Sequence, residues 1–185
     1  MSFEYNLPSE LNKIKFAREA ASVMRTHASQ GLSNHVVGGH TFNMITMLLI
    51  LKPDASGDLI RAVVQHDIPE RITGDMPHPA KKAGIQDDAK QQEIESYLNI
   101  LVFGYDAILS LSEEDTAWVH GLDMLEFYMY CRDEQMLGNR GITTKIMAVE
   151  SYMEKYKHKY PEKILDVFYD LTDGSWETLP DAGGL

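Results

Sequence analysis

Apolar residues recur at three- and four-residue steps along most of this chain, which is the spacing of amphipathic α-helices. The first helix is predicted over residues 11–24, after a Pro8-Ser9-Glu10 start that resembles a helix cap. Its apolar stripe consists of Leu11, Ile14, Ala17, Ala21 and Met24. Further helices are predicted over residues 39–51, 58–67, 86–102, 112–137 and 142–160, and a short one begins at Pro69. No segment has the alternation of a strand, so the pattern predicts an all-α protein.

Two segments interrupt this periodicity and are predicted to be loops. Residues 25–39 are rich in glycine, serine and asparagine, and long ordered loops of this kind often carry function. Residues 74–84 contain Pro77 and Pro79, which should stiffen the backbone there. Only residues 173–185 look loosely ordered, so we expect a single domain over residues 1–172 and a short C-terminal tail.

Composition and charge narrow the classes of function. The chain has 185 residues and a formal net charge of -11, and an acidic surface repels the phosphates of nucleic acids and membranes. The single cysteine, Cys131, cannot form an internal disulfide, and the N-terminus lacks a signal-peptide pattern, which favours the cytoplasm. The longest apolar run, residues 44–51, is far short of the roughly 20 residues that cross a bilayer. We therefore expect neither a nucleic-acid nor a membrane partner.

Residues 66–81 carry the densest set of chemically reactive side chains in the chain. They begin with the adjacent pair His66 and Asp67, which need further ligands from elsewhere to hold a metal ion. His40 and Asp123, on two other predicted helices, are the candidates. Imidazoles combined with carboxylates are the ligands expected for zinc, manganese, iron or cobalt. The predicted ligands of a divalent metal centre are therefore His40, His66, Asp67 and Asp123.

The local context of these residues supports the assignment. His40 follows Gly39, whose missing side chain would let helix and loop approach closely. Asp123 lies in a mostly apolar helix, and a buried carboxylate is costly unless it is paired or bound to metal. Glu70 follows Asp67 by three residues, which on a helix places it over the same patch, within reach of the attacking water. The structural alternatives are a hydrogen-bonded core role for His40 and an arginine partner for Asp123.

The pattern of His40, His66-Asp67 and Asp123 resembles the H…HD…D signature of the HD-domain phosphohydrolases, an all-α superfamily of metal-dependent phosphoesterases. A second set resembles one branch of that superfamily, which contains bacterial 5'-deoxynucleotidases and small phage enzymes that hydrolyse dATP to deoxyadenosine and triphosphate. This set consists of Arg25, Glu70, Thr73, Gly74, Asp75, Pro77, Pro79 and Lys81. The resemblance spans about residues 25–131, and the string over residues 70–81 is its most specific part.

The resemblance implies an HD-type helical bundle and a role for each functional residue of the string. Glu70 and Asp75 would be catalytic, with Glu70 as the acid/base at the attacking water and Asp75 near the scissile ester or the leaving sugar. Arg25 and Lys81 would bind phosphate, and Asp75 would also contact the substrate. The alternatives are that Asp75 only shapes its turn, that Lys81 is solvated surface and that Arg25 only stabilises the end of a helix.

One residue departs from the pattern of the branch. Its deoxynucleotidases have an aromatic residue after the arginine, placed against the sugar, whereas this chain has Thr26. Thr26 and His27 are the predicted substrate contacts here, and His27 or the loop over residues 29–37 is the candidate to replace the aromatic residue. Three histidines, His27, His35 and His78, lie in loops near the predicted site, and a surface position is favoured for at least two of them.

These implications favour a phosphohydrolase that cleaves the 5'-phosphoester of a deoxynucleotide, with dATP as the favoured substrate. The cofactor would be a divalent ion, with zinc, cobalt, manganese and magnesium as candidates. The runner-up is a 5'-deoxynucleotidase acting on monophosphates. A noncatalytic nucleotide-sensing HD module is the alternative of another class, and a purely helical interaction protein is a third. The intact Glu70 counts against a sensor, which needs no acid/base there.

The resemblance also bears on assembly and location. It implies a homo-oligomer, and the aromatic and methionine side chains over residues 115–137 are the candidate subunit face, although the pattern alone does not distinguish such a face from core. It also implies a location in the cytoplasm of a bacterium or of a phage-infected host cell.

Overall fold

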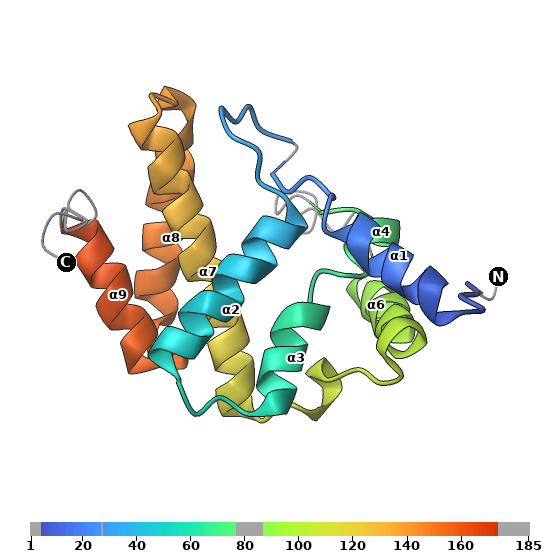
Figure 1. Cartoon of the computed structure of the whole chain (residues 1–185). Helices are drawn as coiled ribbons and strands as arrows, with labels where there is room; N and C mark the ends of the chain where they lie inside the picture. Colours follow the sequence, from blue (N-terminus) through green and yellow to red (C-terminus); the bar gives the residue numbers. More distant parts are fainter. Residues whose placement is uncertain (1–4, 27, 77–86, 174–185) are drawn as a thin grey trace, which may run out of the picture.

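A computed structural model describes residues 5–26, 28–76 and 87–173 of the chain. The α-helices in these ranges are α1 (Glu10–Ala20), α2 (Val37–Leu51), α3 (Gly57–Gln65), α4 (Glu70–Thr73), α6 (Asp88–Phe103), α7 (Glu113–Met136), α8 (Thr143–Tyr156) and α9 (Glu162–Thr172) (Figure 1). The 3-10 helices are η1 (Ile108–Ser110), η2 (Arg140–Ile142) and η3 (Lys157–Lys159). The described residues form no strand beyond an isolated bridge between Met24 and Val36, so the prediction of an all-α fold is confirmed.

The core consists of two groups of helices. In the larger group, α7 packs against α2, α3, α8 and α9, and their apolar side chains bury one another around Leu48 and Leu125. In the smaller group, α1 packs against α4 and α6 around Phe16 and Leu98. Figure 1 shows α8 and α9 of the larger group on the left, α2 and α3 of the same group in the middle, and the smaller group on the right. The segments that follow α1 and α3 therefore lie where the two groups meet.

Most of the predicted helices are present, with small shifts at their ends. Ser112 caps α7 by accepting a hydrogen bond from the Asp115 N–H, and Pro69 stands directly before α4. α2 begins at Val37, two residues before its predicted start, which places His40 in its first turn. The predicted loop after α4 lies outside the described residues beyond Met76, as does the C-terminal tail beyond Asp173.

The apolar stripe predicted for the first helix is wrong. α1 ends at Ala20, and Leu11 and Ile14 are 58% and 57% exposed. The buried face is instead formed by Phe16 and Ala20, which pack against residues of α6. Two faces of this short helix are apolar, and the larger Phe16 ring decides between them because burying it removes more apolar surface from water.

α9 is a helix that the sequence analysis does not predict. Pro161 stands before its first residue, and the buried side chains Ile164, Phe168 and Leu171 follow a helical spacing. They pack against α7, where Gly121 leaves room for Ile164: a Cβ at this glycine would lie 3.2 Å from two side-chain carbons of Ile164. The missing side chain of Gly121 therefore sets how closely α9 approaches α7.

The candidate subunit face on residues 115–137 is largely core. Trp118, Tyr128 and Tyr130 are buried in α7, and only the C-terminal end of this segment exposes large apolar side chains, at Met136 and Leu137. These aromatic rings fill the space between α7 and its neighbours, which the sequence pattern could not distinguish from a subunit contact.

α2 carries an exposed stripe without a charged residue. The stripe consists of Gly39, Phe42, Asn43, Thr46, Leu49 and Ile50, which recur at helical spacing. Phe42 and Ile50 are each 69% exposed, although the opposite face of the same helix is buried at His40, Met44 and Leu48. A helix that is apolar on more than one face usually contacts a partner on each.

None of the described helices is long and apolar enough to cross a membrane.

The close approach at the start of α2 involves Gly38 rather than Gly39. A Cβ on Gly38 would lie 2.9 Å from the Ala21 Cβ and 3.1 Å from the Ala21 carbonyl oxygen. A Cβ on Gly39 would have more room, because its nearest neighbour would be a Val36 side-chain carbon 3.9 Å away. The Gly38 N–H also donates a hydrogen bond to this carbonyl oxygen, at 3.0 Å. The approach that the sequence assigned to Gly39 therefore belongs to the residue before it.

We expect the two glycines to respond in opposite ways to alanine. Gly38→Ala should destabilise the fold by about 1–3 kcal/mol, because the new methyl group meets the backbone of Ala21. Gly39→Ala is the matched control and should be neutral or stabilising by up to about 1 kcal/mol, since alanine favours the helix. Urea unfolding of both variants measures the difference, and equal stabilities would contradict this account of the contact.

The homo-oligomer remains a prediction, and we expect its subunits to meet through the exposed stripe of α2. Because the chain has a net charge of -11, two copies meet with least repulsion through an uncharged surface. We expect a dimer by analytical ultracentrifugation, and a monomer when Phe42→Glu and Ile50→Glu are combined. The matched control combines Met136→Glu with Leu137→Glu and should remain a dimer. A monomeric wild type, or a dimer that survives the α2 substitutions, would contradict the prediction.

Candidate metal centre

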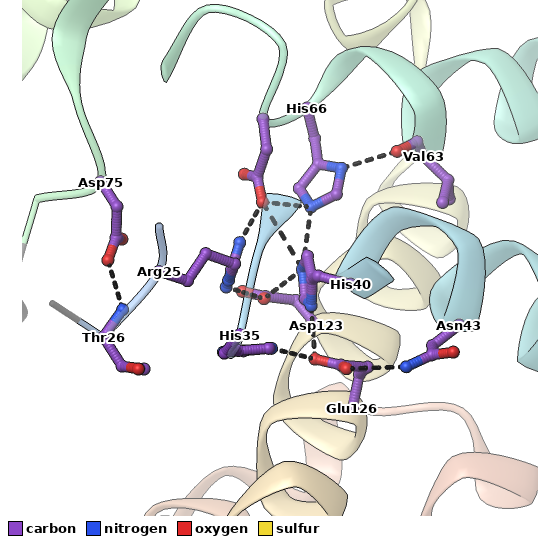
Figure 2. Close-up of polar contacts among 11 residues, drawn as sticks. Arg25, Thr26, His35, His40, Asn43, Val63, His66, Asp75, Asp123 and Glu126 are labelled. Atoms are coloured by element: carbon purple, nitrogen blue, oxygen red, sulfur yellow. Dashed lines mark hydrogen bonds and ion pairs between the residues drawn. The ribbon is translucent and has the colours of Figure 1, made fainter. Parts of the chain in front are cut away.

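Side chains from three segments of the chain converge on one point between the two groups of helices. His40 comes from the first turn of α2, His66 and Asp67 follow α3, and Asp123 comes from the middle of α7. Figure 2 shows His40, His66 and Asp123 pointing toward one another. His40 Nε2 lies 3.3 Å from His66 Nε2, 3.5 Å from Asp67 Oδ2 and 3.2 Å from Asp123 Oδ1. His66 Nε2 lies 3.2 Å from Asp67 Oδ2.

These separations fit a shared metal ion. Ligand atoms about 2.1 Å from one ion lie about 3.0–3.4 Å from each other in octahedral or tetrahedral geometry. The distances from His40 Nε2 to the other three atoms, and from His66 Nε2 to Asp67 Oδ2, are close to that spacing. The mixture of imidazoles and carboxylates suits a divalent transition metal or zinc. The site is not sealed, because the side chain of Asp123 is 38% exposed and so leaves a way in from solvent.

Hydrogen bonds orient both imidazoles with Nε2 toward this point. His66 Nδ1 lies 2.6 Å from the Val63 carbonyl oxygen, and because a carbonyl can only accept, this nitrogen carries the proton. His40 Nδ1 in the same way donates to the carboxylate of Glu126. The nitrogen that faces the other ligands is therefore Nε2 in each ring, as a metal ligand requires.

Arg25 bridges the two carboxylates of the site. Its Nη1 donates to Asp67 Oδ2, and its Nη2 donates to Asp123 Oδ1 at 3.1 Å (Figure 2). Asp123 thus has the arginine partner that was its structural alternative, and the same arginine is the one predicted to bind phosphate. Its side chain is 12% exposed, so the guanidinium is held within the site rather than in solvent.

Opposite charges in contact shift the pKa values of these groups. Burial raises the pKa of Asp123, but the hydrogen bond to His40 and the charge of Arg25 outweigh it and hold this pKa well below its usual range. Burial lowers the pKa of His40, but hydrogen bonds with Asp123 and Glu126 raise it to about 9. A metal at this point would have to displace the proton of His40 Nε2.

Backbone hydrogen bonds at the base of the loop over residues 26–34 hold Arg25 in place. The Arg25 N–H donates to the His35 carbonyl oxygen at 2.8 Å, and the Val37 N–H donates to the Val23 carbonyl oxygen at 3.0 Å. Thr26, the next residue, has a φ of 56°, which is strained for a β-branched side chain. The backbone therefore turns sharply at Thr26, directly after the arginine of the site.

Asp75 joins the segment after α4 to this turn. One of its carboxylate oxygens accepts a hydrogen bond of 2.8 Å from the Thr26 N–H (Figure 2). Burial lowers the pKa of Arg25, but the negative charges of Asp67 and Asp123, followed by those of Glu70 and Asp75, hold this pKa above its usual range. Two other residues predicted to bind substrate, His27 and Lys81, lie outside the described residues.

Two functional neighbours of the site were missed by the sequence analysis. Glu126 is 4% exposed and accepts a hydrogen bond from His40, and His35, for which a surface position was considered, is 5% exposed and bonds the same carboxylate at 3.1 Å. The signal for Glu126 was its position three residues after Asp123, which puts both acids on one face of α7. No local signal distinguished His35 from His27 or His78.

Comparison with known proteins identifies the fold and the family. A solved structure described as a conserved hypothetical protein from Pyrococcus furiosus has a TM-score of 0.60 and 17% sequence identity, over 86% of this chain and 99% of that chain. This similarity shows a shared fold. No curated protein matches the sequence.

The model of the family described as HD domain matches residues 19–118, more than half of the chain. Arg25, His40, His66 and Asp67 lie within the matched residues, and Asp123 lies just beyond them. An HD domain points in general to a metal-dependent phosphohydrolase. Because the family model matches more than half of the residues, the chain belongs to the HD-domain family.

Proposed function

We propose that this chain is a metal-dependent phosphohydrolase that cleaves the 5'-phosphoester of a deoxynucleotide, with dATP as the favoured substrate. The observation that carries the proposal is the convergence of His40, His66, Asp67 and Asp123, with Arg25 beside them. The choice of a deoxynucleotide depends on the resemblance of residues 70–81 to the deoxynucleotidase branch. In the proposed reaction water attacks the α-phosphorus, the bond from phosphorus to the 5'-oxygen breaks, and deoxyadenosine and triphosphate leave.

The four convergent side chains would hold the cation. A divalent ion supplies Lewis-acid chemistry, since it lowers the pKa of water and draws charge from a phosphoryl oxygen. The hydrogen bonds from His66 to Val63 and from His40 to Glu126 hold the rings in the required orientation before substrate arrives. This preorganisation lowers the cost of assembling the site.

Arg25 would bind the phosphate of the substrate. Its guanidinium donates to Asp67 and Asp123, so its donors become available to phosphate when these carboxylates are neutralised. Its Nε is buried and has no hydrogen-bond partner among the described residues. A planar guanidinium can grip two phosphate oxygens at once, which a lysine cannot do. Lys81 and His27 stay in the proposal as further substrate contacts, on sequence resemblance alone.

Glu70 and Asp75 would move the protons of the reaction. Glu70 starts α4, three residues after Asp67, and its carboxylate would take a proton from the attacking water. The leaving 5'-oxygen needs a proton in return, and the proton that Glu70 takes from water balances it. Asp75 would lie near that end of the ester. Because Asp75 also accepts from the Thr26 N–H, it links this step to the backbone turn that follows Arg25.

Two alternatives remain open for the substrate and the activity. A 5'-deoxynucleotidase would use the same residues on a monophosphate, and the nature of the phosphate product separates the two enzymes. A noncatalytic nucleotide sensor would bind metal and nucleotide without turnover, and it would have no use for Glu70 near the metal ligands.

We expect wild-type protein to convert dATP to deoxyadenosine and triphosphate. The test incubates deoxy- and ribonucleotides, each as mono-, di- and triphosphate, with Zn²⁺, Co²⁺, Mn²⁺ or Mg²⁺ and identifies the products by ion-exchange chromatography. Orthophosphate from dAMP alone would favour the runner-up enzyme. If no nucleotide is hydrolysed while metal is bound, the hydrolase proposal is wrong and the sensor is favoured.

Glu70→Gln is the companion variant in this assay. It should lower kcat by about 10²–10⁴-fold, the typical contribution of a general acid/base, with the metal content unchanged. Glu93→Gln, on the exposed face of α6, is the matched control and should keep full activity. Full turnover by Glu70→Gln with metal bound would remove Glu70 from the mechanism.

A further inference from the structure

Glu126 lies directly behind the candidate metal centre. It follows Asp123 by three residues on α7, and its side chain is 5% exposed. Its Oε2 accepts hydrogen bonds from His40 Nδ1 and, at 3.1 Å, from His35 Nε2, while its Oε1 accepts one of 3.1 Å from Asn43 Nδ2 (Figure 2). The carboxylate therefore has donors on both oxygens.

A carboxylate in this position imposes one orientation on His40. Both oxygens of Glu126 accept hydrogen bonds, Oε2 from His40 and His35 and Oε1 from Asn43, so the group acts as a carboxylate acceptor. A carboxylate that accepts from Nδ1 keeps a proton on that nitrogen, which leaves Nε2 as the nitrogen of His40 that could bind a metal. Nε2 is then the atom that faces His66 and Asp123.

His35 ties this carboxylate to the loop that carries Arg25. Its ring stacks on Tyr130 with centroids 4.1 Å apart and planes 8° from parallel, and its carbonyl oxygen accepts from the Arg25 N–H. Its Nδ1 is buried and has no hydrogen-bond partner among the described residues, which suits a neutral ring that donates from Nε2 to Glu126. His35 thus fixes Glu126 from the side opposite to Asn43.

We propose that Glu126, held in place by His35 and Asn43, is a positioning residue that orients His40 and thereby sets the metal affinity of the centre. The inference rests on the proposed function in one respect, which is that His40 is a metal ligand. A carboxylate on the second ring nitrogen makes an imidazole a stronger ligand and removes the rotational freedom that binding would otherwise cost. Losing such a partner typically weakens metal binding about 10–100-fold.

The test compares two buried carboxylates of α7. Glu126→Gln keeps the size of the side chain but loses the charge, and it should weaken Zn²⁺ binding about 10–100-fold in competition with a chromophoric chelator. Glu134→Gln is the matched control. Glu134 is equally buried, but it accepts hydrogen bonds from Leu32, Ser33 and Asn139 and bonds none of the four proposed ligands. Its substitution should change metal affinity less than about threefold.

A spectroscopic measurement separates positioning from general stability. The visible absorption of the Co²⁺-loaded protein should shift in Glu126→Gln and stay unchanged in Glu134→Gln, even if both variants unfold at lower temperature without metal. If Glu126→Gln does not fold, Asn43→Ala decides, because it removes one donor to Glu126 at an exposed position. This variant should weaken Zn²⁺ binding in the same direction by a smaller factor.

The results also distinguish this inference from the proposed function. Wild-type Zn²⁺ affinity in folded Glu126→Gln, or in Asn43→Ala where the first variant does not fold, would overturn the positioning role and leave the hydrolase proposal intact. Weakened binding in a protein that hydrolyses no nucleotide would support the positioning role and overturn the hydrolase. A wild type that binds no divalent ion would overturn both.

Discussion

The contact of Arg25 with Asp67 and Asp123 is the interaction on which the rest of the arrangement depends. It joins the segment after α1, a helix of the smaller group, to the segment after α3 and the middle of α7, two helices of the larger group. Two carboxylates that share one guanidinium would repel each other and resist burial without a cation between them. The guanidinium fulfils this requirement in the protein as described, and a bound divalent ion would meet it more strongly. The two carboxylates thus require a positive charge, which joins the three segments through Arg25 and would favour binding of a divalent cation.

One face of α7 organises both the metal centre and the loop beside it. Asp123, Glu126, Tyr130 and Glu134 follow each other at three- and four-residue steps. Asp123 faces the convergent ligands, Glu126 and Tyr130 hold His35, and Glu134 accepts the backbone N–H groups of Leu32 and Ser33. Burial raises the pKa of Glu134, but its hydrogen bonds lower it to about 2, so the anchor of the loop stays charged. The loop that follows Arg25 is therefore fixed to the helix that carries Asp123, one of the proposed ligands.

Much of the fold and part of the site could be predicted from the sequence. Helical periodicity was enough for α2, α3, α6, α7 and α8, and the residues His40, His66, Asp67 and Asp123 named from the sequence do lie together, although their role as ligands stays a proposal. The face of α1 was wrong because only its packing against α6 decides which of two apolar stripes is buried. Glu126, Glu134 and His35 were missed for a similar reason. An acid on a long helix or a histidine in a loop is usually solvated, and what buries these three is tertiary contact between residues about a hundred positions apart.

The central claim is that one divalent cation is held by two imidazoles and two carboxylates, and anomalous diffraction from crystals grown with Zn²⁺ or Mn²⁺ tests it most directly. The account predicts a single strong anomalous peak within about 2.0–2.3 Å of His40 Nε2, His66 Nε2, and carboxylate oxygens of Asp67 and Asp123. It also predicts that Arg25 no longer donates to the two oxygens that bind the ion. A peak elsewhere, or a structure at saturating metal in which Arg25 still bridges the two carboxylates with no ion beside them, would contradict it.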